Sequence, residues 1–240
     1  MIRKLPPEAI HVLYLDANGN TNIRSGVYAE EAFVEIGAAF EKKTIIVEDK
    51  MAKLVIEKIL KDRNIFANFD VLKAPNGAEW IKKNAILAHS LAGTENVLFI
   101  LDGDKRKEHR APDDIPQSFN SRLSEIIYAQ TGCNIEIPHE KDNEEDKIIK
   151  QRNLLKYCKK HVFYFPVNDP EEILWEYADG RETISETDIK KCFCQQSYKI
   201  FGDDTADHIF NIAEICANKM NTGANEKCQE LLRNIENFLQ

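Results

Sequence analysis

The chain has 240 residues, of which 43% are hydrophobic and 30% are charged, and its formal net charge is −8. This composition is ordinary for a globular protein with one large or two small domains. The negative net charge excludes a protein that binds nucleic acid over its whole surface. The sequence holds neither a membrane-spanning run nor a signal-peptide hydrophobic region, so we expect a cytoplasmic protein without membrane contact.

The N-terminal stretch is expected to form a hairpin followed by a helix. Two strands flank Asn18-Gly19, a dipeptide that favours the positive φ angles of tight hairpin turns. Apolar residues between positions 29 and 40 recur at helical spacing. We therefore assign residues 1–41 to an N-terminal hairpin and helix.

Strands and helices alternate from residue 44 onward. Thr44 to Val47 is a β-branched run, and residues 51–63 carry apolar side chains on one helical face. A strand at 69–72, a helix at 78–92 and a strongly apolar strand at 97–101 follow. This alternation predicts an α/β fold, with a mostly parallel, Rossmann-like sheet flanked by helices.

The second half of the chain adds one strand and several helices. A proline-containing loop is expected after Lys105, then a helix at 121–130 and a charged segment at 139–158 that leads into a solvated helix. A strand is expected at 161–166. A helix should start near Pro170, because proline is favoured in first helical turns. From residue 185 the pattern is helical, so we assign 42–180 to the α/β domain and 181–240 to a C-terminal helical extension.

The cysteines and histidines do not form a recognisable metal or disulfide pattern. Six cysteines include no C-x-x-C pair, and the six histidines lack H-x-x-x-H spacing. We therefore expect reduced thiols and no zinc site.

Acidic residues follow two of the predicted strands. Glu48 and Asp49 come directly after one strand, and Asp102-Gly103-Asp104 follows another. Either motif alone could cap a helix. Together they predict a magnesium site, because side chains that leave parallel strands converge at one sheet edge and Mg²⁺ prefers carboxylate oxygens. We expect Glu48 and Asp102 to be exposed at that edge.

This arrangement resembles the TOPRIM domain of topoisomerases, primases and OLD-type (overcoming lysogenization defect) nucleases. The match to the C-terminal nuclease part of OLD-like proteins rests on Glu48 and on the Asp102-x-Asp104 pair. The resemblance implies a TOPRIM-like catalytic domain at 42–180 and hydrolysis of phosphodiester bonds with Mg²⁺ or Mn²⁺. Glu48 would then bind metal or handle a proton, and Asp102 and Asp104 would bind metal.

The same resemblance indicates further acids. Glu171 is a candidate ligand of a second metal, with Glu172 as the neighbouring alternative. Two positions depart from the family pattern: Asp49 stands where many TOPRIM proteins have glycine, and Ala52 stands where OLD-type enzymes often have an acid. Asp49 is therefore also a candidate metal ligand.

Basic residues beside the acids complete the predicted site. Lys105 is the candidate catalytic lysine that neutralises charge in the transition state, with Lys190 and Lys191 as alternatives. The basic run after Asp104 is a candidate contact for backbone phosphates, and a solvated basic loop is the competing interpretation. The residues of this nucleic-acid-binding run are Lys105, Arg106, Lys107 and Arg110.

The resemblance also implies partners and a biological role. We expect DNA rather than RNA as the substrate, defence against phage or mobile DNA as the setting, and a homo-oligomer as one possible assembly. The chain lacks the G-x-x-x-x-G-K-[ST] phosphate loop, so an ABC-type ATPase would have to be supplied by another subunit or domain.

Two other functions fit parts of the sequence. The strand ending in Glu48-Asp49 also resembles a response-regulator receiver, in which Asp102 would accept a phosphoryl group. The Gly-Asp-Lys-Arg sequence after Asp102 differs from the usual receiver loop. The second alternative is a non-catalytic TOPRIM-like subunit that regulates an ATPase.

Overall fold

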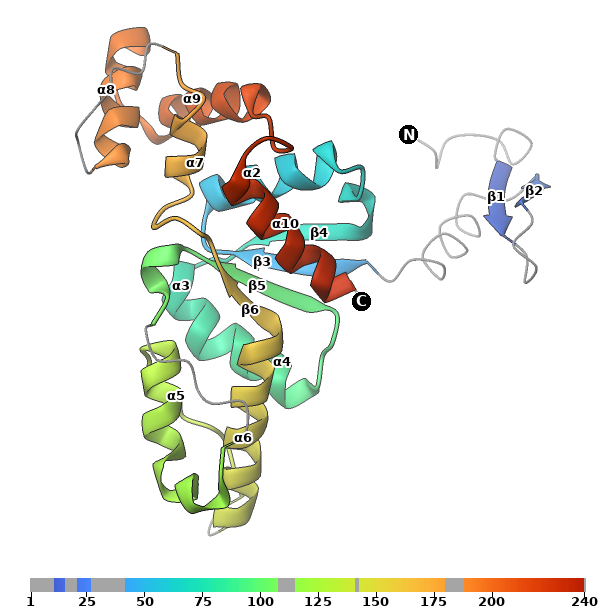
Figure 1. Cartoon of the computed structure of the whole chain (residues 1–240), viewed down its shortest axis with the longest axis vertical. Coiled ribbons are helices and arrows are strands. Elements are labelled where there is room, and N and C mark those ends of the chain that lie inside the picture. The colour runs from blue at the N-terminus through green and yellow to red at the C-terminus, as the bar shows by residue number, and fades with distance from the viewer. Residues whose placement is uncertain are drawn as a thin grey trace. The chain divides into compact units, whose positions relative to one another are not determined.

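The computed structural model describes residues 11–15, 21–26, 42–107, 115–140, 143–179 and 188–239. The chain forms two compact units, Met1–Lys42 and Lys43–Gln240. In the first, β1 (His11–Leu15) pairs antiparallel with β2 (Thr21–Ser25) (Figure 1), which confirms the two strands of the predicted hairpin. The Asn18-Gly19 turn and the helix expected at 29–40 lie outside the described residues.

A four-stranded parallel sheet forms the centre of the second unit, in the order β4-β3-β5-β6. Residues Thr44 to Val47 of β3 pair with Val97 to Ile100 of β5, so the two strands that precede the acidic motifs are neighbours. The predicted α/β fold with a parallel sheet is confirmed. The strands are β3 (Lys43–Val47), β4 (Phe69–Lys73), β5 (Val97–Leu101) and β6 (Val162–Tyr164).

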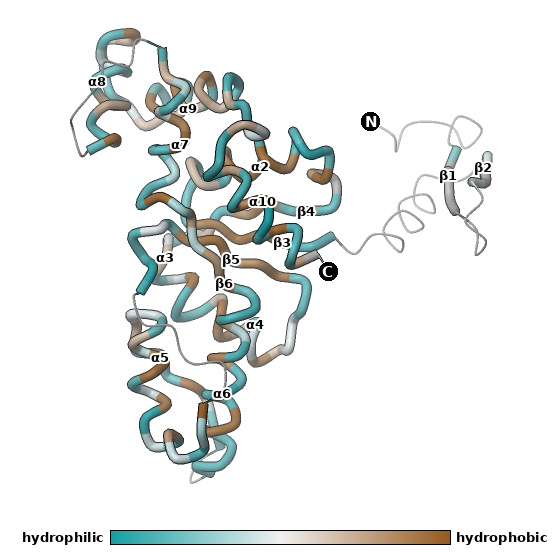
Figure 2. The backbone as a smooth tube through the Cα atoms, viewed as in Figure 1, coloured by the Kyte–Doolittle hydropathy of each residue, from teal (hydrophilic) through white to brown (hydrophobic). Residues whose placement is uncertain are grey.

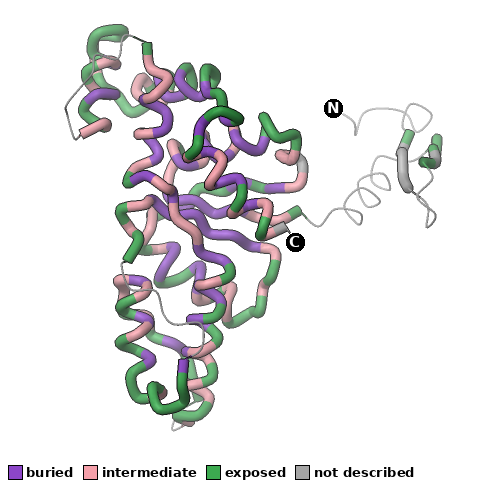
Figure 3. Tube along the Cα trace, viewed as in Figure 1, coloured by how far each residue is buried: buried purple, intermediate pink, exposed green. Residues whose placement is uncertain are grey.

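Both faces of this sheet are buried by helices. Successive strand residues point to opposite faces, so Ile45 and Leu98 belong to one core cluster and Ile46 and Phe99 to another. The central strands β3 and β5 are accordingly apolar and largely buried, whereas three residues of the edge strand β4 are exposed (Figures 2 and 3). This is the pattern of a parallel sheet between two helical layers.

The first core cluster packs against α2, α7 and the C-terminal helices, and the second against α3 to α6. The helices and their bounds are α2 (Lys50–Asp62), α3 (Gly77–Trp80), a π-helical turn (Ile81–Ala85), α4 (Ile86–Ala92), α5 (Leu123–Thr131), α6 (Glu144–His161), α7 (Glu171–Trp175), α8 (Ile189–Phe201), α9 (Ala206–Lys219) and α10 (Glu226–Leu239).

The predicted C-terminal helical extension consists of α8, α9 and α10. Ile212 of α9 and Leu231 of α10 are buried in the same cluster as Ile56 of α2, so the extension supports one face of the sheet. None of the helices among the described residues has both the length and the apolar character needed to span a membrane.

Candidate metal-binding site

The turn between β3 and α2 presents two acids with different surroundings. Asp49 is the N-cap of α2, and its Oδ1 accepts a hydrogen bond of 2.8 Å from the backbone N–H of Ala52. Capping a free N–H of the first helical turn is a common role for aspartate. Glu48 precedes the cap and is only 8% exposed, so it points away from solvent while Asp49 holds the helix start.

Glu48 is tied to the end of the neighbouring strand. The backbone N–H of Asp102, directly after β5, donates a hydrogen bond of 2.9 Å to Oε1 of Glu48. Asp102 is 6% exposed. The expectation that Glu48 and Asp102 lie exposed at the sheet edge is therefore wrong: both are buried.

The turn after Asp102 is closely packed at Gly103. A Cβ atom added to Gly103 would lie 2.0 Å from the carbonyl oxygen of Val167, and the N–H of Asp104 donates a hydrogen bond of 3.3 Å to the carbonyl of Asn168. The segment after β6 therefore packs directly on the turn after β5. Only glycine leaves room for this approach of two backbones.

Asp104 and Lys105 lie at the solvent side of the same turn. They form an ion pair with each other, and their side chains are partly exposed. The hydrogen bond with Asp104 raises the pKa of Lys105, with Glu48 and Asp102 acting in the same direction. Lys105 is thus a charged side chain that can still reach a ligand.

Glu171 enters the site from a third element. It occupies the first turn of α7, is 6% exposed, and its Oε2 is buried with no hydrogen-bond partner among the described residues. The neighbouring Glu172 instead accepts a hydrogen bond of 3.2 Å from the N–H of Asp169. Of the two acids, Glu171 is therefore the one that lies in the site.

The buried acids act on one another electrostatically. Burial, followed by the charges of Glu48, Asp49, Glu171 and Asp104, raises the pKa of Asp102 to about 8. Burial also raises the pKa of Glu171, to about 7, with Asp49 adding to the effect, and it raises the pKa of Glu48. Several like charges in a low-dielectric region disfavour their own ionisation.

The buried acids offer carboxylate oxygens, the donors that a divalent cation prefers. Within the described residues, neither Oδ1 of Asp102 nor Oε2 of Glu171 has a hydrogen-bond partner, and a buried carboxylate oxygen without a partner is costly. No three His, Cys, Asp or Glu side chains of the described segments are already gathered as a metal-binding group. Mg²⁺ needs only one or two carboxylates, because it keeps several water ligands.

Lys82 is the residue that sequence reasoning missed. It lies in the π-helical turn, is 6% exposed, and its Nζ donates a hydrogen bond of 3.4 Å to the carbonyl of Lys105. Burial lowers its pKa, opposed by the charges of Cys133 and Glu48. Its spacing of four residues from the buried Ile86 places it on the apolar helix face, which was the available signal.

The other predicted basic residues have different surroundings. Lys190 forms an ion pair of 2.6 Å with Asp169 and also interacts with Glu171 and Asp102. Lys191 pairs instead with Asp188, at 3.4 Å.

The predicted nucleic-acid-binding run is described only in part. Arg106 donates a hydrogen bond of 3.2 Å to the carbonyl of Phe165, and Lys107 is exposed. Arg110 lies outside the described residues. Lys105, Arg106 and Lys107 therefore follow the Asp102-Gly103-Asp104 turn as a continuous basic segment.

Comparisons with known proteins give little information about this chain. No protein-family model and no curated protein matches it. Two solved structures of the C-terminal region of the OLD protein from Xanthomonas campestris pv. campestris, phased with mercury and with iodine, are similar at 13% and 14% identity, with TM-scores of 0.30 and 0.31. In each case the alignment covers 81% of this chain and 78% of the other. TM-scores this low support no conclusion about the fold or the activity of this chain.

Proposed function

We propose that this protein is a metal-dependent nuclease that hydrolyses phosphodiester bonds of nucleic acid. The observation that supports this most strongly is the pair of buried, unpartnered carboxylate oxygens of Asp102 and Glu171, beside Glu48. Buried acids with raised pKa values near a turn rich in lysine and arginine are typical of functional sites. Structural stability alone does not account for them, because one buried oxygen of each carboxylate has no hydrogen-bond partner among the described residues.

The metal ligands in this proposal are Glu48, Asp102, Asp104 and Glu171, with Asp49 in support. Mg²⁺ or Mn²⁺, when bound, would supply an activated water and stabilise charge on the phosphate oxygens. Glu48 has one oxygen engaged by the N–H of Asp102, which fixes the orientation of its carboxylate. Asp49 has one oxygen engaged in its cap, so it contributes mainly negative charge.

The lysines have complementary roles. Lys105 is partly exposed beside Asp104 and would contact an oxygen of the scissile phosphate. Lys82 is buried and lies close enough to Glu48 for the two charges to interact. Its positive charge would partly balance the negative charge of the acids. A fixed cation aimed at developing negative charge stabilises a transition state most where water is excluded.

The choice of DNA over RNA, the ABC-type ATPase partner, the cytoplasmic setting and the role in phage defence belong to the same proposal. They rest on the resemblance of Glu48 and the Asp102-x-Asp104 pair to OLD-like proteins. Self-association is part of that expectation.

The test is cleavage by the purified protein. Supercoiled plasmid and tRNA are incubated separately with Mg²⁺, with Mn²⁺ and with EDTA, alongside Asp102→Asn and, as a matched control, Asp70→Asn on β4. We expect metal-dependent cutting of plasmid that Asp102→Asn abolishes and Asp70→Asn retains. If Asp102→Asn cuts as well as the wild type, the assignment is wrong.

The receiver alternative keeps one specific observation in its favour. The order β4-β3-β5-β6 corresponds to the first four strands of the 2-1-3-4-5 order of flavodoxin-like proteins. In that case Asp102 would take a phosphoryl group from a small phosphodonor such as acetyl phosphate. Mass spectrometry that finds Asp102 phosphorylated, together with no cutting of plasmid or tRNA, would favour the receiver; absence of both activities would favour a regulatory subunit.

A further inference from the structure

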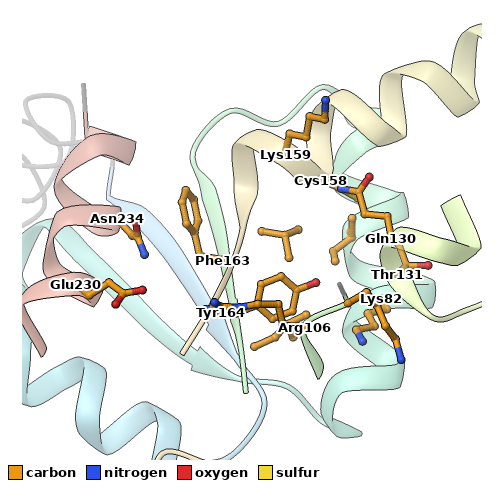
Figure 4. Close-up of a pocket in the computed structure, with 14 residues that line it drawn as sticks. Lys82, Arg106, Gln130, Thr131, Cys158, Lys159, Phe163, Tyr164, Glu230 and Asn234 are labelled. Carbon is orange, nitrogen blue, oxygen red and sulfur yellow. The ribbon is translucent and has the colours of Figure 1, made fainter. Parts of the chain in front are cut away.

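A cavity of about 490 Å³ lies along β6, next to the candidate metal site (Figure 4). Its walls come from β5 and β6, the ends of α5 and α6, and one face of α10. This volume lies in the range of pockets that hold small organic ligands. The cavity is thus of a size that suits a ligand such as one nucleotide.

The charge of the lining favours an anion. Of the described residues, four cationic side chains and one acid, Glu230, line the cavity. The cations come from three separate places in the sequence, so the charge is produced by the fold and not by one basic run. They are Lys82, Arg106, Lys107 and Lys159.

An aromatic surface lies among these cations. Tyr164 of β6 lines the cavity, and the guanidinium carbon of Arg106 lies 5.8 Å from the centre of its ring. Figure 4 shows Tyr164 and Arg106 next to each other in the middle of the cavity. Aromatic rings and guanidinium planes are the surfaces on which unpaired bases stack.

Gln130 adds a polar group to the cavity lining, and the chemistry of this group suits a nucleic-acid base. Its Oε1 is buried and has no hydrogen-bond partner among the described residues, and the side chain lines the cavity. A carboxamide can both accept and donate hydrogen bonds, which suits the edge of an unpaired base.

The cavity and the candidate metal site share one wall. Lys82 lines the cavity, bonds to the carbonyl of Lys105 and interacts with the charge of Glu48. A strand with one phosphate at the acids would therefore place an adjoining nucleotide at Lys82. Arg106 and Lys107 continue from the acidic turn into the same cavity.

We infer that this cavity binds one unpaired nucleotide of a nucleic-acid strand, with its base on Tyr164 and its phosphate at Lys82 and Lys107, while Lys159 adds positive charge on the other side of the ring. This inference rests on the proposed nuclease function and specifies its substrate as single-stranded or locally unpaired nucleic acid. A base within a duplex cannot enter unless it leaves the stack, which costs free energy.

The test is binding without catalysis. Fluorescence anisotropy is measured in EDTA with a labelled thymidine strand of about 12 nucleotides and with a blunt duplex of the same length. The variants are Tyr164→Ala, Tyr164→Phe and Lys159→Ala, and the matched control is Lys73→Ala, an exposed lysine on the opposite edge strand β4. Melting temperatures establish that each variant is folded.

We expect the single strand to bind at least about fivefold more tightly than the duplex, and Tyr164→Ala to lose about fivefold or more of that affinity. Tyr164→Phe and Lys73→Ala should bind as the wild type does, whereas Lys159→Ala should bind more weakly. Equal affinity for strand and duplex, or unchanged binding by folded Tyr164→Ala, overturns the inference. Cleavage is scored separately with Asp102→Asn, so a failed nuclease proposal is distinguishable from a failed pocket.

Discussion

The backbone N–H of Asp102 donates a 2.9 Å hydrogen bond to Oε1 of Glu48, and this bond joins the ends of the neighbouring strands β5 and β3. One acid of the site is therefore also a structural partner for the backbone of another. The two roles of Glu48 can be separated, because an uncharged acceptor satisfies the N–H but binds a divalent cation poorly.

We predict that Glu48→Gln and Glu48→Ala both abolish cleavage but differ in stability. Glu48→Ala leaves the buried N–H of Asp102 without a partner and should lower the free energy of unfolding by about 1–3 kcal/mol. Glu48→Gln keeps an acceptor and should unfold near the wild-type urea midpoint. Equal urea midpoints for the two variants would show that the hydrogen bond has no structural importance.

Gly103→Ala should damage both the fold and the activity. Its Cβ would meet the backbone carbonyl of Val167 at 2.0 Å, so the segment after β6 must shift. We expect a loss of about 1–3 kcal/mol in the free energy of unfolding. The matched control is Gly223→Ala, where the nearest atom, Oδ1 of Asn221, is at 3.6 Å; similar losses in both variants would refute the argument from close approach.

The metal-free protein should lose stability as pH rises toward 8. The pKa of Asp102 is about 8 in the folded chain and 3.8 as an ordinary aspartate, so the folded state binds more protons between these values. The contribution of Asp102 to stability is complete below about pH 4 and is lost as pH rises through about 8. Asp102→Asn should melt at a higher temperature than the wild type at pH 8 in EDTA; parallel pH curves for the two proteins would argue against this.

Addition of Mg²⁺ should reverse that loss. A cation that binds only the folded state stabilises it, and carboxylate ligands release their protons on binding. We therefore predict that Mg²⁺ raises the melting temperature of the wild type more at pH 8 than at pH 6. The same titration on Asp102→Asn should give little shift, and a shift equal to that of the wild type would mean that the cation binds elsewhere.

Lys82→Met should reduce cleavage without unfolding the protein. Methionine has a similar length and carries no charge to be buried, and burial already lowers the pKa of Lys82, so stability should be unchanged or higher. Removal of the cation beside Glu48 should lower kcat about tenfold or more. Lys83→Met, at the exposed neighbour that pairs with Glu79, serves as the control and should cut normally.

The parallel sheet and the meeting of its two acidic motifs could be predicted because both depend on local patterns. A β-branched run, an amphipathic helix and a second apolar strand together fix the neighbours β3 and β5, and Glu48 and Asp102 follow from where those strands end. The position of Glu171 followed from the family resemblance.

The burial of the acids could not be predicted in the same way. Burial depends on contacts between distant segments, such as the approach of the segment after β6 to Gly103 from more than sixty residues farther along the chain, and no periodicity records that contact. Lys82 was missed for a related reason, because a lysine in a helix is usually exposed. The cavity along β6 combines residues from five separate segments, so only the folded chain brings it together.

The packing of Val167 on Gly103 also sets the order in which the site can be completed during synthesis. A nascent chain that has passed residue 104 already contains both acidic motifs, but it lacks the segment that packs on Gly103 and the carboxylate of Glu171. The set of acids is therefore complete only after residues 165–171 have left the ribosome. A cell making this protein would be exposed to its completed site only once most of the chain had been translated.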